Sequence, residues 1–179
     1  MRVSKTVLIA LLLSITMVSA YSQTKFTEKK AGHVYSVSVP DYMTKTVTLN
    51  DVATMQYINS AKNAYLVVID DSKEELEMKG IKFASLKDFH DDNIKHLKGE
   101  ENDPVESSPV EFEANGNKFY QTELNVNFKE KDNLEVKITY LITYVETKGY
   151  YYQILCWSLS PEYKNLTADF KKIAASIRD

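Results

Sequence analysis

Two neighbouring stretches with strict alternation constrain this fold more than any other feature. In the first, residues 117–128, every second position on one side is apolar or Thr: Tyr120, Thr122, Leu124, Val126 and Phe128. In the second, residues 134–145, the shared face is Val136, Ile138, Tyr140, Ile142 and Tyr144. A period of two is the pattern of a β-strand that places one face on a core. The polar segment Lys129–Asn133 between them predicts a turn, so the two stretches form an antiparallel hairpin.

Further strands are predicted on both sides of this hairpin. Asn115-Gly116 is the strongest short turn signal in the chain, and it joins residues 110–114 to the first alternating stretch. The block Tyr65–Ile69 is apolar without alternation, so we expect cover on both of its faces. The remaining predicted strands are His33–Pro40, Thr54–Ile58 and Ala64–Asp70, the last two forming a hairpin.

The stretch "KGYYYQILCWSLSP", residues 148–161, is apolar on both faces and contains the only cysteine. One face carries Tyr150, Tyr152, Ile154 and Cys156, and the other carries Tyr151, Leu155, Trp157 and Leu159. We therefore expect a central strand covered on both sides. A catalytic cysteine needs a thiolate and access to solvent, whereas an uncharged cysteine among aromatic residues is typical of a core. Cys156 is predicted to be buried and structural.

Two amphipathic helices complete the pattern. Residues 85–99 begin with Ser85 as a predicted N-cap and Asp88 three positions on, and Gly99 ends the helix. The second begins with Ser160 as a predicted cap and Pro161, and repeats apolar residues at Tyr163, Leu166, Phe170, Ile173, Ala174 and Ile177. Strands followed by a helix, strands and a helix predict an α+β domain on a twisted antiparallel sheet of about six strands.

The first 22 residues are predicted to be a signal peptide. Arg2 and Lys5 precede the apolar run Val7–Val18, which is too short to span a bilayer. Small residues allow cleavage after Ala20 or after Ser22. We expect export to the periplasm or the medium, with no stable membrane span after cleavage.

Residues 23–179 are predicted to form one domain. A net charge of -3 without a basic stripe argues against nucleic acid as a partner. One cysteine excludes an internal disulfide, so stability must come from burial.

The whole pattern resembles the PsbP-like superfamily, which includes an extrinsic photosystem II protein, a Ran-binding import factor and exported bacterial proteins. The resemblance is carried by "YSVSVPDYM", the hairpin of residues 54–70, "SLKDFHDDNIKHL" and "YYYQILCWSLSPEYKNLTADFKKIAASI". It implies helices on both faces of the sheet. It implies no activity, because members bind different things and a fold does not define a function.

No candidate catalytic, cofactor or metal site follows from the remaining residues. His33 is placed on the first strand, and His90 and His96 lie six apart on a helix, where they do not share a face. The acids Asp70, Asp71, Glu74, Glu75 and Glu77, and the second group Glu100, Glu101 and Asp103, do not match a calcium loop and are predicted to be a solvated face. Asp91 and Asp92 beside His90 suggest a general base, but no nucleophile accompanies them.

Twelve tyrosines are the clearest excess. Core packing is the expectation for Tyr120, Tyr140 and Tyr144, and a ligand groove with aromatic walls is the alternative. We predict a non-enzymatic exported module that binds an envelope protein, an extracellular protein or a small ligand. The first alternative is a hydrolase-type enzyme with a site built from scattered residues, in which Cys156 or His90 takes part. A weaker alternative is a cation-responsive accessory protein that uses the acids of residues 70–77.

Overall fold

A computed structural model describes residues 23–33, 35–98, 104–129 and 135–179. The predicted signal peptide, the predicted helix end at Gly99, the acids of residues 100–103 and most of the turn at residues 129–133 lie outside these ranges. The strands are β1 (Phe26–Ala31), β2 (Tyr35–Pro40), β3 (Thr44–Lys45), β4 (Met55–Asn59), β5 (Ala64–Ser72), β6 (Val105–Glu106), β7 (Val110–Ala114), β8 (Asn117–Lys129), β9 (Glu135–Glu146) and β10 (Tyr150–Leu159). The helices are the 3₁₀ turn η2 (Ser60–Lys62), α2 (Lys73–Met78), α3 (Leu86–Lys98) and α4 (Ser160–Ala175).

The fold is α+β on an antiparallel sheet, but the sheet is larger than predicted. Among the described residues it has eight strands, in the order β3-β4-β5-β10-β9-β8-β6, with β7 also paired to β8. The estimate of about six strands was wrong because β3 and β6 contain two residues each and are too short to show a period. A separate ribbon of β1 and β2 was also missed as a pair, because β1 reads FTEKKA and has no clear alternation.

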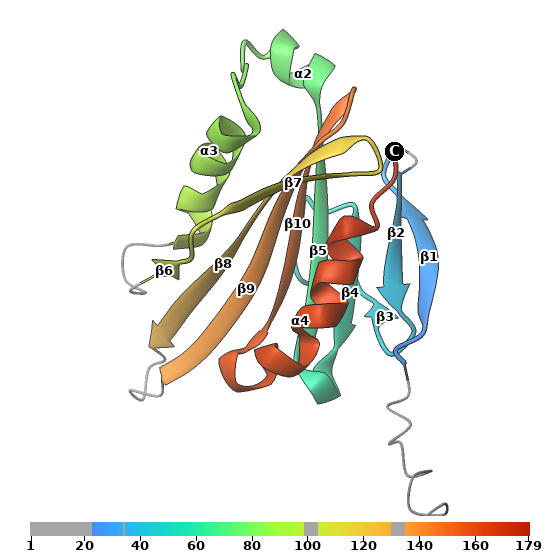
Figure 1. The fold of residues 1–179 in the computed structure, drawn as a ribbon, viewed down its shortest axis with the longest axis vertical. Helices are drawn as coiled ribbons and strands as arrows, with labels where there is room; N and C mark the ends of the chain where they lie inside the picture. Colours follow the sequence, from blue (N-terminus) through green and yellow to red (C-terminus); the bar gives the residue numbers. More distant parts are fainter. Residues whose placement is uncertain (1–22, 34, 99–103, 130–134) are drawn as a thin grey trace, which may run out of the picture.

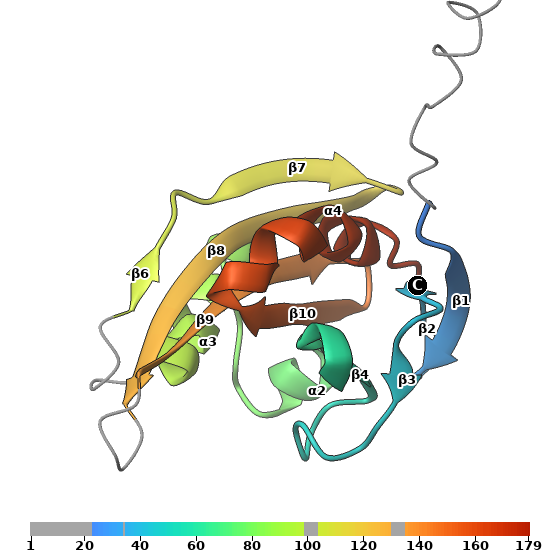
Figure 2. The ribbon, with the colours of Figure 1, turned by 90° about the horizontal axis from the view of Figure 1, so that it is seen from below.

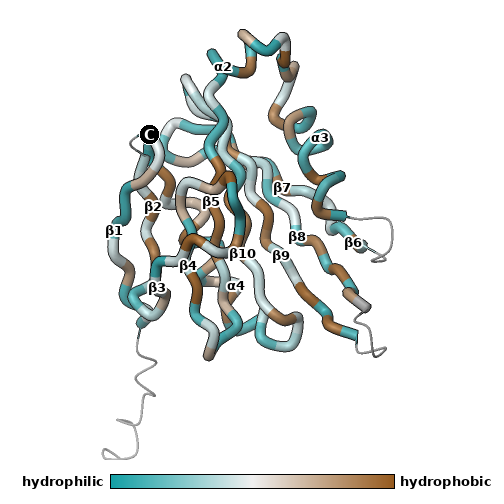
Figure 3. The backbone as a smooth tube through the Cα atoms, turned by 180° about the vertical axis from the view of Figure 1, so that it is seen from behind, coloured by the Kyte–Doolittle hydropathy of each residue, from teal (hydrophilic) through white to brown (hydrophobic). Residues whose placement is uncertain are grey.

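The central position of the last strand is confirmed. β10 lies between β5 and β9 and pairs antiparallel with both. Cys156 and Ile154 contribute to the core on one face of the sheet, whereas Tyr151 and Leu155 contribute to the core on the other. The block around Val67 is likewise buried on both faces, as its lack of alternation predicted. Figure 3 shows hydrophobic stretches along these strands and a hydrophilic β1.

Helices cover both faces of the sheet, as the resemblance implied. Helix α4 and strand β2 cover one face, and α3 covers part of the other (Figures 1 and 2). The apolar positions predicted for the last helix, from Tyr163 to Ile177, are all buried, although α4 itself ends at Ala175. No helix of the described chain combines the length and the apolar composition that crossing a membrane requires.

The predicted turn at Asn115-Gly116 and the predicted cap at Ser85 are confirmed, whereas the predicted cap at Ser160 is wrong. Asn115 and Gly116 both have positive φ, 53° and 78°, as a hairpin of this type requires. The Asp88 amide donates to Ser85 Oγ at 3.1 Å, which confirms that cap. Ser160 is not a cap: it is already helical, and its hydroxyl pairs with Thr139 Oγ1 at 2.8 Å instead.

The acidic stretch after β5 contains a helix that the pattern did not predict. In α2 the Glu75 amide donates to Ser72 Oγ at 3.4 Å, and Glu74 and Glu75 occupy the first turn. Acidic side chains there favour the positive end of the helix. Six residues are too few to show the apolar stripe by which α3 and α4 were recognised.

Candidate functional site

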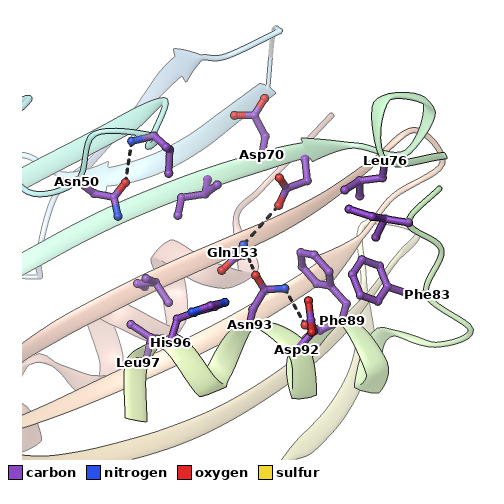
Figure 4. Close-up of a pocket in the computed structure, with 15 residues that line it drawn as sticks. Asn50, Asp70, Leu76, Phe83, Phe89, Asp92, Asn93, His96, Leu97 and Gln153 are labelled. Atoms are coloured by element: carbon purple, nitrogen blue, oxygen red, sulfur yellow. Dashed lines mark hydrogen bonds between the residues drawn. The ribbon is translucent and has the colours of Figure 1, made fainter. Parts of the chain in front are cut away.

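A groove lies between α3, the connection from α2 to α3, and the α3-facing side of β5 and β10 (Figure 4). It exists because α3 packs mainly against β8 and β9, so that it leaves the neighbouring strands partly uncovered. Its volume is about 560 Å³. The residues that line it are Asn50, Val52, Ile69, Asp70, Asp71, Leu76, Ile81, Phe83, Phe89, Asp92, Asn93, His96, Leu97, Gln153 and Leu155. Small-molecule sites in proteins commonly have this size and this mixture of apolar and polar walls.

One end of the groove is built from aromatic rings. Phe83 meets Phe89 edge to face, with ring centroids 5.1 Å apart. Phe89 in turn stacks on Tyr151 of β10 at 4.7 Å. Edge-to-face and stacked pairs fix the orientation of each ring. The connection from α2 to α3 is therefore held on the sheet by its own aromatic side chain.

A short chain of polar side chains crosses the floor of the groove. Gln153 Nε2 donates to Asn93 Oδ1 at 3.0 Å and reaches Asp71 Oδ2 at 3.4 Å. Asp71 is partly buried beside these groups. Burial raises the pKa of its carboxyl above the usual range, and the contact with Gln153 offsets only part of that effect. Asp71 thus carries a carboxylate in a setting that stabilises its charge poorly.

The preceding residue, Asp70, serves a different site. Successive residues of a strand point to opposite faces, and in Figure 4 the Asp70 side chain is directed away from the groove. Its Oδ2 lies 3.1 Å from His33 Nδ1, and the other ring nitrogen of His33 lies 2.9 Å from Asp179 Oδ1. We call His33, Asp70 and Asp179 the histidine clasp. It joins the β1–β2 turn, β5 and the segment after α4.

Each residue of the clasp makes a further contact. Thr54 Oγ1 donates to Asp70 Oδ1, and Thr147 Oγ1 donates to Asp179 Oδ2 at 2.6 Å. The His33 ring stacks on Tyr150, with centroids 3.4 Å apart. Gly32 has φ +60°, and a Cβ there would approach Asp70 Oδ2 to 2.9 Å, so glycine lets the turn reach the carboxylate.

The clasp favours a protonated His33. Partial burial lowers the pKa of the imidazole, but the hydrogen bonds and charges of Asp179 and Asp70 outweigh it, and the net pKa is raised. Both ring nitrogens can donate only when the ring is charged. For Asp179, burial raises the pKa, but hydrogen bonds from Thr147 and His33 bring it below its ordinary value.

The structure places the three predicted histidines in three different settings. His33 lies in the turn after β1 rather than on a strand, which corrects the prediction. His90 is buried on α3, with its nitrogens 2.9 Å from Asp91 Oδ1 and 2.8 Å from Glu106 Oε1. His96 is exposed and lines the groove together with Asp92, one turn earlier on α3.

Cys156 is fully buried, as predicted, and burial raises the pKa of its thiol. Within the first acidic group, the prediction of a solvated face holds for Glu74, Glu75 and Glu77, which are exposed. It was wrong for Asp70 and Asp71, because β5 carries them into the sheet. Within the described ranges, no group of three or more His, Cys, Asp or Glu side chains is arranged to hold a metal ion.

The tyrosines of the predicted inward faces are core residues. Tyr120 and Tyr144 are buried and Tyr140 is partly buried, all on the face that α3 shares. The aromatic residues that line the groove are Phe83 and Phe89, not tyrosines. Asp71, Asn93 and Gln153 were not predicted to lie together. One signal was present: Gln153 is the one amide side chain in the apolar strand β10.

Comparison with known proteins supports the fold. No family model matches the chain, and no curated protein matches it with significance. The solution structure of cyanobacterial PsbP (CyanoP) from Synechocystis sp. PCC 6803 matches at TM-score 0.55 and 10% identity, over 92% of this chain and 98% of that one. LpqN, involved in cell envelope biogenesis of Mycobacterium tuberculosis, matches at TM-score 0.48 and 11% identity, over 87% of this chain and 90% of that one. The chain therefore has a PsbP-like fold, as its sequence resemblance indicated.

Proposed function

We propose that the protein is a non-enzymatic exported module that binds a small ligand in the groove between α3 and the sheet. The observation that carries the proposal is the groove itself: about 560 Å³ of space that joins an aromatic wall to a short polar chain. A concave apolar site with a few convergent polar groups is the usual form of a ligand site. The predicted signal peptide supports the exported location.

The burial of Cys156 and the hydrogen-bond partners of His33 and His90 favour binding over catalysis. Cys156 is buried, so a substrate cannot reach its sulfur without unfolding. Both nitrogens of His33 and of His90 lie within hydrogen-bond distance of carboxylates. A general base needs a free nitrogen that faces a substrate.

The binding proposal is tested by a fragment screen on the ¹⁵N-labelled protein. We expect hits to shift amide signals of α3, β5 and β10 around the groove. His96→Trp places a large side chain in the groove from an exposed position and should weaken these hits about tenfold or more. Lys87→Trp is the matched control, because Lys87 is exposed on the same helix and neither it nor its partner Asp91 lines the groove. Shifts that gather elsewhere, or hits equally weakened by both variants, would contradict the proposal.

A hydrolase is the second candidate, and the shared position of His96 and Asp92 in the groove is what favours it. An aspartate four residues before a histidine lies on the same helix face and can orient the ring. A panel of p-nitrophenyl esters tests it: hydrolysis lost in His96→Asn but kept in Lys87→Asn would establish an enzyme. Equal rates in both variants would exclude His96 as its base.

The exported location has its own test. We expect the full chain, expressed in a Gram-negative host, to be recovered from the periplasm with Tyr21 or Gln23 as its first residue. Mass spectrometry of the intact protein reads that residue directly. Recovery of an unprocessed chain from the cytoplasm would contradict export.

A further inference from the structure

The charges around the groove restrict what it can bind. Its lining includes three carboxylates, of Asp70, Asp71 and Asp92, and neither lysine nor arginine among the described residues. Two of these charges are already compensated. Asp70 faces His33 on the opposite side of the sheet, and Asp92 is exposed and lies 3.8 Å from Lys95 Nζ.

Asp71 is the carboxylate that the fold leaves without an adequate partner. Among the described residues, its carboxylate accepts one side-chain hydrogen bond, from Gln153 Nε2 at 3.4 Å, and the same amide also donates to Asn93 Oδ1 at 3.0 Å. An ionised carboxylate can accept about four hydrogen bonds. A partly buried charge with spare acceptor capacity favours a ligand that brings a positive donor.

The walls on either side of Asp71 are apolar. Leu76 and Phe83 lie at one end of the groove and Leu97 at the other (Figure 4), and Ile81 and Leu155 add further apolar lining. Val52 and Ile81 remain well exposed at the rim, at 69% and 42%. Burial of such side chains under a ligand contributes roughly 25 cal/mol per Å² of apolar surface removed from water.

A metal ion does not suit these surroundings. Calcium takes six to eight oxygen ligands, and magnesium takes an octahedral set. Here one undercompensated carboxylate stands beside the amides of Asn93 and Gln153. An ammonium group, by contrast, pairs with a single carboxylate and fills its remaining donor sites with amide oxygens.

We propose that the groove binds an organic monocation, a primary amine on an aryl or alkyl body, with its ammonium group on Asp71 and its apolar body against Leu76 and Phe83. This inference rests on the proposed binding function and names its ligand class. The amine donates to the Asp71 carboxylate, and the Asn93–Gln153 pair fixes the depth at which it sits.

The test compares three probes of nearly equal shape: 4-phenylbutylamine, 4-phenylbutan-1-ol and 4-phenylbutanoate. Dissociation constants and binding positions come from ¹⁵N chemical-shift titrations at pH 8. We expect the amine to bind about tenfold more tightly than the alcohol, and the carboxylate to bind most weakly.

Two variants assign the preference to one side chain. Asp71→Asn keeps the shape of the side chain and should lower the amine affinity about tenfold while it leaves the alcohol affinity within about twofold. Glu74→Gln is the matched control, since it removes the same charge from an exposed site on α2 that does not line the groove. It should leave all three affinities unchanged.

The outcomes separate this inference from the binding function. If fragments bind the groove but the alcohol binds as tightly as the amine, the inference is overturned and the binding function stands. If neither the fragment library nor the three probes shift the amide signals of groove residues, both the inference and the binding function are overturned. The ratio of amine affinity to alcohol affinity is measured on the unmodified protein. A ratio near one would therefore overturn the inference even if the Asp71→Asn variant did not fold.

Discussion

Asp70 and Asp71 are neighbours on β5, yet the fold treats their charges in opposite ways. Asp70 is 8% exposed at its side chain and is held by His33 and Thr54. Asp71 is also partly buried, but among the described residues its one side-chain hydrogen bond is a long one, from the Gln153 amide at 3.4 Å. A strand sends consecutive side chains to opposite faces, so one carboxylate enters the clasp and the other enters the groove. The difference distinguishes a charge that stabilises the fold from a charge that is available to a ligand.

Removal of Asp70 should have the largest effect on stability. Asp70→Ala leaves His33 and the hydroxyl of Thr54 without their shared acceptor. We expect a loss of roughly 2–3 kcal/mol in the free energy of unfolding, measured by urea denaturation. Glu74→Ala, exposed on α2, should change stability by less than about 0.5 kcal/mol. Equal losses in the two variants would mean that the clasp contributes nothing.

The rate at which the Cys156 thiol is labelled measures the contribution of Asp70 to stability in a second way. It belongs to the core on the Asp70 side of the sheet, together with Tyr35 and Tyr152. We expect Ellman's reagent to modify it at least about 1,000-fold more slowly than in the urea-unfolded chain. If the Asp70→Ala loss is about 2 kcal/mol, labelling should accelerate about 30-fold. Fast labelling of the unmodified protein would disprove the core assignment.

The clasp should depend on pH through His33. Its raised folded pKa means that the stabilisation is fully present below the unfolded value of about 6.5 and is lost as pH rises through the folded value. The lowered pKa of Asp179 adds stability that is present above about pH 4 and is lost as pH falls.

His33→Gln should therefore lower stability most between pH 5 and 6, by about 1–2 kcal/mol, and least above pH 9. Melting curves of both proteins across this range measure the difference. A gap that stays constant with pH would show that His33 acts through packing alone.

Neutralising Asp71 should have the smallest effect, and of opposite sign. Because burial raises the pKa of its carboxyl, ionisation of Asp71 destabilises the folded state as pH rises above about 4. Asp71→Asn should then leave the protein equally stable at pH 3.5 and as stable or more stable, by up to about 1 kcal/mol, at pH 7. Thermal unfolding at the two pH values measures this. A clear loss of stability at pH 7 would assign Asp71 a structural role like that of Asp70.

The sequence predicted the fold better than it predicted the site. Alternation located β8 and β9, and two-sided apolarity placed β10 at the centre, because burial acts on whole strands and leaves a periodic trace. The site depends on where α3 stops covering the sheet, which is set by packing between residues distant in sequence. Gln153 and Asp71 lie 82 positions apart, and only the pairing of β5 with β10 brings them together. The clasp was missed for the same reason, since His33 and Asp179 are 146 positions apart.

A crystal structure of the protein with 4-phenylbutylamine tests the division between Asp70 and Asp71 most directly. The predicted result is an ammonium nitrogen about 2.8 Å from the Asp71 carboxylate, with the phenyl ring against Phe83 and the contact between His33 and Asp70 unchanged. An amine bound to the exposed acids of α2, or one that displaces His33 from Asp70, would contradict it.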